Sequence, residues 1–479
     1  MSDTNQVTLN YVIEDTPGET PTNPVFRRLR YTGAPSLSFS PQTVVSNEIA
    51  PSRRVQDLIT VGADAGGGVD FELAAADHDD MLRMVLANNW AEQANRVGAD
   101  ITSISSGSMT VASGAANGGF GPGDLVSLLG FDLNNMPVAE LETGSDDTTL
   151  NITALQAETP PDTAQVRKVG YQGSSGEFSL AQSGSVWELQ SSGFDFDADA
   201  LLVPGVWVQV VGFDTEKANG MFRVSNVMPG ALQFDEVPTG VVSDDGVGDS
   251  VKVFFGDYLR DSSIDITATI EQNFTDHDPT TRLYYRGERL GEMSLQLDSR
   301  AIVTGSYTFA GESAEYQEGS RVSGATDLPP LLGTPFNTSN NVAAMRLDGE
   351  EVTGPNFALS VSMQIQNNLR DQQAVGKFVS IGSGRGEFSL TGTIETYFGD
   401  KTLAQQVVNN TETSFDILTK DAQGRGLLFD VPRLKWTSGA PEVAGKNEDV
   451  TASLEFQALA FSLNGEDYTT NIGRYWYLP

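Results

Sequence analysis

The residues best suited to chemistry in this sequence form an acidic run that contains a histidine, Asp77-His78-Asp79-Asp80. Carboxylate and imidazole groups can bind a metal or transfer protons, and Asp77 would face Asp80 if the run were helical. Acidic residues in a first helical turn are, however, the usual complement to the helix dipole. A second predicted helix begins after Asp400-Lys401-Thr402, which does not repeat the cluster. We therefore interpret residues 77–80 as a helix start and predict no metal site.

Three other patterns suggest chemistry, and each lacks an essential part. The acidic stretch 195–199 lacks the Gly and the terminal Glu of a helix–loop–helix calcium site, so we interpret it as a solvated loop. The glycine-rich stretch 382–386 precedes a predicted strand, whereas a phosphate-binding loop opens a helix. We interpret it, and the glycines at 66–68, as tight turns. His277 lies between two aspartates without a serine elbow. The sequence thus predicts a protein that is not an enzyme and uses no cofactor.

Composition narrows the possible classes further. The 479 residues include 64 acidic and 29 basic side chains, a formal net charge of −35, with two histidines and no cysteine. The absence of cysteine excludes disulfides and thiolate metal sites. Excess negative charge disfavours specific binding of a nucleic-acid backbone, although it is compatible with DNA that passes without sticking. Solubility alone would also explain the charge. No run approaches the ~18–20 apolar residues that span a bilayer, and the first residues do not resemble a secretion signal.

Alternation of apolar and polar residues dominates the chain and predicts half-buried strands. The clearest examples are residues 264–270, 359–365 and 450–458. Only two helices are predicted, one after Asp77 and one after Asp400, because an Asp can cap free backbone N–H groups. Further strands are expected at residues 37–39, 69–73, 293–297, 303–309, 388–394 and 415–418.

Each predicted helix lies in the same order of segments: strand, long polar loop, glycine-rich turn, strand, helix and further strands. This order predicts two copies of one module. The first copy is interrupted by an insert that itself contains two similar runs, Gly121-Pro122-Gly123 leading to Gly130-Phe131, and Val203-Pro204-Gly205 leading to Gly212-Phe213. The predicted domains are residues 1–97 with 259–318, inserted modules at 98–175 and 176–258, a linker at 319–341, and a second main domain at 342–479.

The order of several landmarks resembles the tail tube proteins of long, non-contractile-tailed bacteriophages. These landmarks are Ser46-Asn47-Glu48-Ile49, Phe71-Glu72-Leu73, Asp79-Asp80-Met81-Leu82, Phe398-Gly399-Asp400, Phe415-Asp416-Ile417, and Pro432 to Gly439 continuing to Asp449 to Leu454. In the insert, Asn219 to Val224 resembles accessory modules of some of these proteins. The first inserted copy lacks this run. The resemblance covers most of the chain outside the insert.

The resemblance implies an all-β fold with two tail-tube-type sandwich or barrel domains, each with one short helix, plus small inserted β-barrel or β-sandwich modules. It also implies a structural virion protein, made in the host cytoplasm, whose rings stack into the channel for DNA. Its partners would be copies of itself, the tape measure, tail terminator and tail-tip proteins, and DNA in transit. Because related rings use six single-domain subunits, a chain with two modules predicts a trimeric ring.

The two long polar loops, residues 47–61 and 367–379, are the predicted contacts between subunits and rings, because both copies keep such a loop in the same place. Charged side chains there could pair with acids of an adjacent ring, and the alternative is that they are solvated hairpin tips. The predicted contact residues are Asn47, Glu48, Arg53, Arg54, Asn368, Arg370 and Lys377.

A rival hypothesis from another class is an acidic adhesin or carbohydrate-binding surface protein. Such a protein needs a secretion signal or exposed aromatic platforms. Trp187 and Trp207 in the insert could serve as platforms, or they could fill small cores, which is the interpretation we favour.

Overall fold

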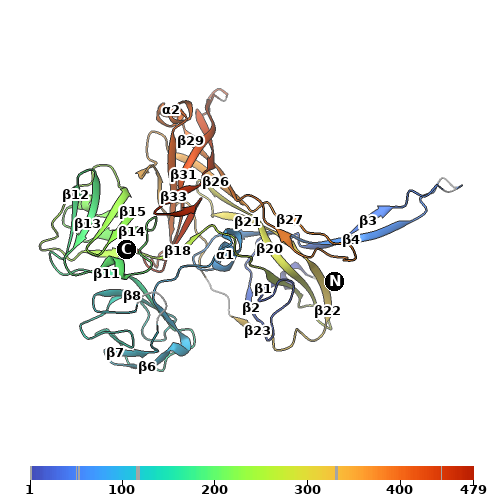
Figure 1. Cartoon of the computed structure of the whole chain (residues 1–479), viewed down its shortest axis with the longest axis horizontal. Helices are drawn as coiled ribbons and strands as arrows, with labels where there is room; N and C mark the ends of the chain where they lie inside the picture. The colour runs from blue at the N-terminus through green and yellow to red at the C-terminus, as the bar shows by residue number, and fades with distance from the viewer. Residues whose placement is uncertain (1–2, 50, 52–53, 115–118, 329–332, 444) are drawn as a thin grey trace.

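The computed structural model describes residues 3–49, 51, 54–114, 119–328, 333–443 and 445–479. The chain is all-β, as predicted, with two short α-helices in the described part. Two β-sandwich halves form the body, a long hairpin projects from it, and two inserted lobes lie at the opposite side (Figure 1). No helix among the described residues is long and apolar enough to cross a membrane.

An eight-stranded antiparallel sheet runs through both halves and is called the inner sheet. Apolar and polar residues alternate along most of its strands, so one face packs on the core and the other faces outward. Strand β20 pairs with β26 and thereby joins the two halves edge to edge. In spatial order the strands are β3 (Ser38–Val45), β4 (Leu58–Glu72), β21 (Thr304–Gly311), β20 (Thr281–Asp298), β26 (Ala358–Gln366), β29 (Ser389–Tyr397), β32 (Thr451–Ala458) and β31 (Gly426–Glu442).

Each half has its own outer sheet, which covers the core face of the inner sheet. The long strands β20 and β31 pass from one layer into the other, so they belong to both. The first outer sheet contains β1 (Val7–Ile13), β2 (Val25–Arg28), β19 (Ala268–Phe274), β22 (Ser313–Glu318) and β23 (Thr326–Leu328). The second contains β24 (Val342–Leu347), β25 (Glu350–Glu351), β30 (Glu412–Lys420), β35 (Asn471–Tyr475) and β18 (Asp257–Arg260).

The two long strands bend at matching positions. In β20 the register shifts between the pairs formed by Tyr285 and Glu288 and again between Leu290 and Glu292. In β31 it shifts between Val431 and Leu434 and again between Trp436 and Ser438. Bulges of this kind bend a strand and increase its twist. The spacing between the two bulges is the same in both strands, so residue 285 corresponds to 431 and residue 292 to 438.

The two helices lie in equivalent places but are buried differently. Helix α1 (Asp79–Leu86) buries five apolar residues, whereas α2 (Thr402–Asn409) buries none completely. The N-cap residue of α2 is Lys401, but Asp400 satisfies the first free N–H of the helix, since it accepts the N–H of Thr402 at 2.8 Å. The corresponding prediction for Asp77 is wrong, because its carboxylate pairs with Arg30 instead. Each helix ends at a residue with positive φ, Ala87 or Asn410, which terminates the helix.

The insert forms two small β modules, each with its own apolar core. A shared strand, β11 (Gln165–Gln172), pairs with β8 of the first module and β17 of the second. The strands of the first module are β5 (Asn95–Val97), β6 (Ile101–Ser105), β7 (Ser108–Val111), β8 (Asp124–Leu129), β9 (Met136–Glu140) and β10 (Thr149–Asn151). Those of the second are β12 (Phe178–Ser183), β13 (Val186–Ser191), β14 (Trp207–Val211), β15 (Gly220–Met228), β16 (Ala231–Glu236) and β17 (Lys252–Phe254).

One backbone-binding asparagine recurs in both inserted modules. Asn135 accepts the N–H of Phe131 at 3.0 Å and donates its amide to the carbonyl of the same residue. Asn219 does the same for Phe213, at 2.9 and 2.8 Å. The first module therefore has a counterpart of Asn219 even though it lacks the rest of that run.

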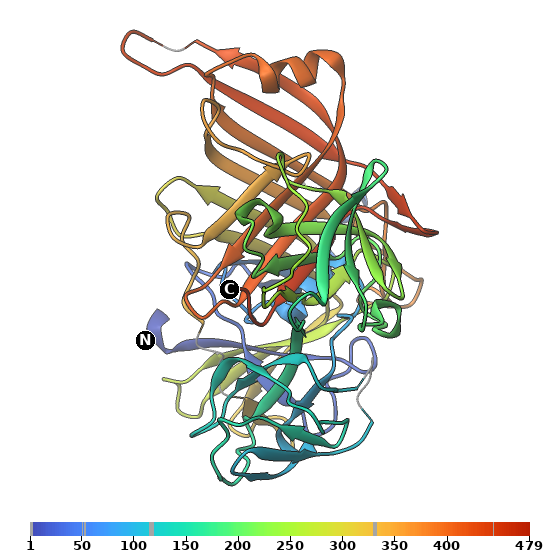
Figure 2. The same ribbon diagram turned by 90° about the vertical axis from the view of Figure 1, so that its left-hand side faces the viewer.

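The inserted modules pack firmly on the second half of the body (Figure 2). Residues such as Trp207 and Phe254 of the insert share a buried apolar cluster with Leu428 and Tyr475 of the second half. A buried ion pair crosses the same boundary, with Arg223 Nη1 2.8 Å from Glu236 and 3.7 Å from Asp430. The insert is thus anchored to the body through both apolar and ionic contacts.

Two sequence predictions are wrong in detail. Residues 62–68, predicted as a turn, lie inside strand β4. Gly66 and Gly67 have φ of 133° and 146°, and a Cβ there would lie 2.4 Å from Phe309 O and 2.3 Å from Ser36 O, respectively. Glycine therefore permits close strand contact rather than a turn. Residues 264–267 precede β19 instead of belonging to it, and Ile264 donates its N–H to Ala87 O at 2.8 Å.

Short elements complete the structure. They are the 3-10 helices Thr4–Gln6, Gly98–Asp100, Phe196–Ala198 and Glu216–Ala218, and the strands β27 (Arg370–Asp371), β28 (Ser383–Gly384), β33 (Phe461–Leu463) and β34 (Glu466–Tyr468). The predicted domain boundaries remain predictions.

Candidate assembly surfaces

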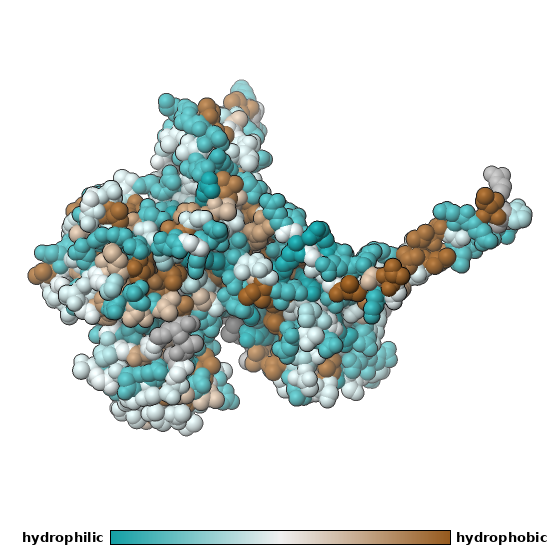
Figure 3. Space-filling model, viewed as in Figure 1, coloured by the Kyte–Doolittle hydropathy of each residue, from teal (hydrophilic) through white to brown (hydrophobic). Residues whose placement is uncertain are grey.

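The hairpin of β3 and β4, called the arm, projects far from the body (Figure 1). All eight residues of β3 are exposed, and apolar side chains lie along both strands and the tip (Figure 3). Exposed apolar surface of this extent on a projecting element is typical of a contact surface. Its exposed apolar residues are Phe39, Val44, Val45, Ile49, Val55, Leu58, Ile59 and Val61.

The second long loop, between β26 and β29, lies against the base of the arm. Ala63 of β4 donates its N–H to Phe378 O at 3.2 Å. The loop exposes three more apolar residues, Val375, Phe378 and Ile381. The two loops that were predicted from equivalent sequence positions are therefore neighbours within one chain, and both present apolar groups.

The predicted contact residues lie on these two loops. Asn47, Glu48 and Arg54 are in the arm tip, whereas Arg53 lies outside the described residues. In the second loop, Asn368 Nδ2 donates to Glu387 O at 2.8 Å and Arg370 Nη2 to Arg385 O at 3.3 Å, while Lys377 belongs to a turn closed on Ala374 O. Their contact role stays a prediction. Sequence reasoning chose charged and amide residues and missed the exposed apolar residues beside them, which look like ordinary strand residues in sequence.

Two edges of the inner sheet have no partner strand among the described residues. Strand β3 pairs with β4 on one side only. Residues 436–442 of β31 pair with β32 on one side only. Unpaired edges invite pairing with other chains, and natural sheets often carry proline there to limit it. Each of these edges has one proline, Pro41 in β3 and Pro441 in β31.

The nitrogen of Pro41 points away from β4. Ser36 donates its N–H to Gly68 O at 2.9 Å, and donors alternate between the two sides of an antiparallel strand. Odd-numbered residues from 37 to 41 therefore direct their nitrogens to the free side. Leu37 and Phe39 offer donors to a partner strand there, and Pro41 offers none.

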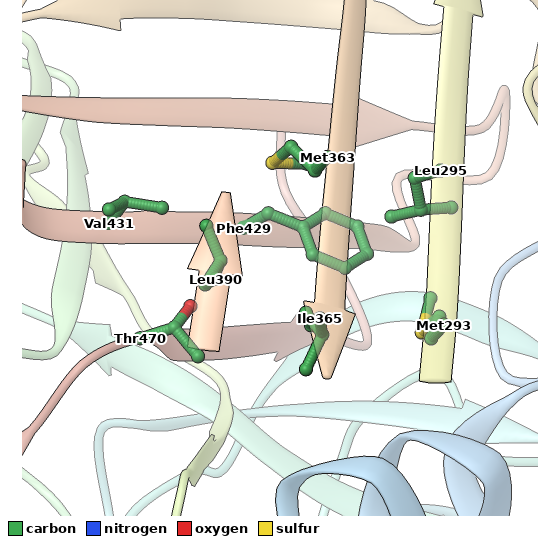
Figure 4. Close-up of a pocket in the computed structure, with 8 residues that line it drawn as sticks. All are labelled: Met293, Leu295, Met363, Ile365, Leu390, Phe429, Val431 and Thr470. Atoms are coloured by element: carbon green, nitrogen blue, oxygen red, sulfur yellow. The ribbon is translucent and has the colours of Figure 1, made fainter. Parts of the chain in front are cut away.

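The joint between the halves, where β20 pairs with β26, shows how this protein packs a sheet edge that has a partner strand. Pairing of β20 with β26 buries Met293, Leu295, Met363 and Ile365 around a small apolar cavity of about 10 Å³ (Figure 4). Phe429, Val431 and Thr470 cover this joint from the outer layer. Asn367 adds ladder bonds at the end of the joint, since its N–H donates to Gly291 O at 2.8 Å.

The exposed face of the inner sheet is polar and mostly uncharged or acidic. Glu292 accepts amide hydrogen bonds from Gln364 and Gln366 at 2.6 and 3.2 Å, and Ser294 bonds Ser306 at 2.7 Å. The paired positions on this face include Asp64, Asp70, Glu395 and Glu455. A face of hydroxyl, amide and carboxylate groups offers few cations to a phosphate backbone.

The acidic run at α1 has structural partners. His78 is buried, with Nδ1 2.9 Å from the Tyr307 hydroxyl and Nε2 3.1 Å from Glu72 O. Burial lowers the pKa of His78 to about 4, and burial raises the pKa of Asp77 to about 6. Asp79 pairs with Arg474, and Asp80 accepts from Arg83 at 2.9 Å. The contacts of His78 and Asp79 fix the helix to neighbouring strands, whereas the pair of Asp80 with Arg83 lies within the helix.

The acidic stretch in the second inserted module is less exposed than predicted. Asp199 is buried and accepts the Tyr171 hydroxyl at 2.7 Å, with Lys168 Nζ 3.3 Å away. The prediction of a wholly solvated loop is therefore wrong for Asp199. Among the described residues, no group of three His, Cys, Asp or Glu is arranged to hold a metal. Trp207 is buried at the boundary with the second half, which removes it as an exposed aromatic platform.

Comparison with known families gives one match that covers nearly the whole chain. A family model described as phage tail tube protein matches residues 4–458. A search among curated proteins found no match.

Proposed function

Because this chain belongs to the phage tail tube protein family, we propose that it is the repeating subunit of the tube in a long, non-contractile bacteriophage tail. Copies of the chain would associate into rings, and stacked rings would form the channel through which viral DNA leaves. The observation that supports this most directly is the inner sheet, with eight strands, one polar exposed face and two edges that are unpaired in the described part of the chain.

Joining such sheets edge to edge around an axis removes the free edges. The core face of each inner sheet is already covered by the outer sheets and helices, so the polar face would line the channel. Its carboxylate and amide groups would repel or weakly solvate the DNA backbone, which suits DNA in transit. The channel would therefore conduct DNA without holding it.

The ring would be a trimer with pseudo-sixfold symmetry. In support, the strand order β3, β4, β21, β20 in the first half matches β26, β29, β32, β31 in the second, and the long strands carry bulges at matching positions. Each half would then occupy one sixth of the ring. A heterologous contact repeated along the axis would extend the rings into a tube.

The arm and the second loop would provide contacts between neighbouring subunits and stacked rings. Their apolar residues would be buried there, with Asn47, Glu48, Arg53, Arg54, Asn368, Arg370 and Lys377 forming the polar margin. Tape measure, tail terminator and tail-tip proteins would be the other partners in the virion, with assembly in the host cytoplasm.

Electron microscopy of the purified chain at high concentration and moderate salt tests this proposal. Hollow rings or tubes are expected, and rotational averaging should show three chains per ring. A matched variant, Val44→Asp with Ile59→Asp, places charge on the arm and should abolish stacking. Single particles without rings across a range of salt and concentration would count against the proposal, and six chains per ring would disprove the trimer.

A further inference from the structure

Strand β20 in the first half and strand β31 in the second half have equivalent neighbours, which can be traced across the inner sheet. Arg289 and Lys435 each precede the second bulge of their strand by two residues. From these positions, ladder pairs lead to partner residues in each of the next three strands. They are Ala310, Gly66 and Ser38 in the first half, and Gln457, Thr391 and Gln364 in the second.

This tracing places Ser38 of β3 at the position that Gln364 occupies in β26. In the joint within the chain, Gln364 pairs with Ser294, which follows Arg289 by five residues. The residue that follows Lys435 by five is Ala440, and its outer side is unpaired in the described structure. Ser38 and Ala440 thus correspond to the paired residues Gln364 and Ser294, but they are not paired with each other within the described chain.

We infer that β31 of one copy pairs antiparallel with β3 of the next copy in one defined register, with Ala440 opposite Ser38, Gly439 opposite Phe39 and Ser438 opposite Ser40. This inference rests on the proposed function and specifies its subunit interface. The joint within the chain serves as the template, and its partner is a second copy of this chain.

The exposed fractions of two corresponding apolar side chains, one inside the joint within the chain and one at the free edge, support this register. Ile365 is 5% exposed within the joint, whereas Phe39, which corresponds to it, is 38% exposed. Met293, which pairs with Ile365, corresponds to Gly439. In the proposed joint Phe39 therefore faces a glycine, where the template pairs Ile365 with Met293.

The free hydrogen-bonding groups agree with the same register. In the template, odd-numbered residues of β20 exchange ladder bonds with β26, as shown by Asn367 N–H to Gly291 O and Ser299 N–H to Leu359 O. The corresponding residues of β3, Leu37 and Phe39, direct their N–H groups to the free side. Pro41 and Pro441 each remove one donor, so the joint between copies has fewer ladder bonds than the joint within the chain.

Engineered disulfides test the register in a chain that has no cysteine of its own. A pair without mutual ladder bonds has Cα atoms about 4.5 Å apart, within disulfide range. The variants Ser38→Cys with Ala440→Cys, and Ser40→Cys with Ser438→Cys, should form disulfides between copies when assembled rings are oxidised. Non-reducing gels should show covalent dimers and trimers in place of most of the monomer.

Two matched variants control for geometry. Ser40→Cys with Ala440→Cys keeps the same face but is two residues out of register, so it should cross-link at least tenfold less. Ser294→Cys with Gln364→Cys copies the pair within one chain, and it should form a disulfide in the monomer without any covalent dimer. This last variant also shows that the chosen geometry accepts a disulfide in a folded chain.

The outcomes separate the register from the proposed function. Rings in the microscope with cross-linking of the two in-register pairs support the inference. Rings with no cross-linking, or with equal cross-linking of the out-of-register pair, overturn the register and leave the tube proposal standing. A wild-type chain that forms no rings overturns the proposed function and this interface with it.

Discussion

Glu288 and Leu434 occupy the same position in the two long strands, immediately after the first bulge, and both are fully buried. One half of the protein therefore has a carboxyl group where the other half has an apolar side chain. Neither carboxyl oxygen of Glu288 has a hydrogen-bond partner in the described part of the chain. Burial, and secondarily the charge of Glu14, raises the pKa of Glu288 to about 8. Its ionised form is therefore disfavoured in the folded state.

We predict that Glu288 makes the protein less stable as pH rises. Its pKa is about 8 in the folded chain and near 4.5 when unfolded, so the unfolded state releases the proton first. Stability from this group is complete below pH 4.5 and is lost as pH rises towards 8, at about 1.4 kcal/mol per pH unit. Glu288→Gln should remove this slope in denaturant unfolding between pH 5 and 8, whereas the exposed control Glu455→Gln should keep it. Equal slopes for wild type and Glu288→Gln would refute the prediction.

His78, in contrast, should make the folded protein less stable as pH falls. Its pKa is lowered from 6.5 to about 4 in the folded chain, so stability is lost as pH falls from 6.5 through 4. His78→Gln should remove this acid-side loss. It should also cost about 1–3 kcal/mol at pH 7, because the Tyr307 hydroxyl and Glu72 O lose their partner. Thermal melts at pH 5 and 7 measure both effects, with exposed His277→Gln as the control.

Ile365 and Phe39 should differ in what they stabilise, although they occupy equivalent positions. Ile365→Ala enlarges the apolar cavity in the joint and should cost about 2–5 kcal/mol of monomer stability. Phe39→Ala should change monomer unfolding by less than about 1 kcal/mol, because the side chain is 38% exposed. It should instead raise the protein concentration needed for ring formation. Monomer unfolding and light scattering, measured on both variants, distinguish the two effects. A loss of monomer stability in Phe39→Ala similar to that in Ile365→Ala would contradict this.

The buried ion pair between the insert and the body should contribute more to the stability of the folded chain than an exposed ion pair does. Arg223→Met leaves Asp430 and Glu236 buried without a counter-charge and should cost about 3–5 kcal/mol. Arg433→Met breaks an exposed, solvent-screened pair with Glu412 and should leave the stability nearly unchanged. Urea unfolding of both variants provides the comparison. Similar losses would show that the buried pair has no special role in holding the insert.

Much of this fold could be predicted from alternation in the sequence. Residues 359–365 lie within β26, and all but the first of residues 450–458 form β32, because one face of each strand is buried and the other is polar. Gly66 and Gly67 were misinterpreted as a turn because a glycine that permits close strand contact looks the same in sequence as one that turns the chain. The predicted contact loops were found by their polarity, but their apolar residues were not.

The sequence could not predict which strands lie at the unpaired edges of the inner sheet, because strand pairing depends on residues far apart in the chain. Strand β3 and strand β26 occupy equivalent places, yet among the described residues only β26 has a partner on both sides. Buried acidic side chains such as those of Glu288 and Asp430 were also missed. Acidic residues are usually exposed, and no local signal distinguishes the few that a fold encloses.

The joint between β20 and β26 has a kinetic consequence, because it links two sheets that belong to the same chain. Its strands meet at the high effective concentration set by their tether, so this joint forms during folding at any protein concentration. In a ring of three such chains, every second joint would already be made before two molecules collide. Ring formation would then need three joints between molecules instead of six, and the protein concentration would control only the joints that the prolines weaken.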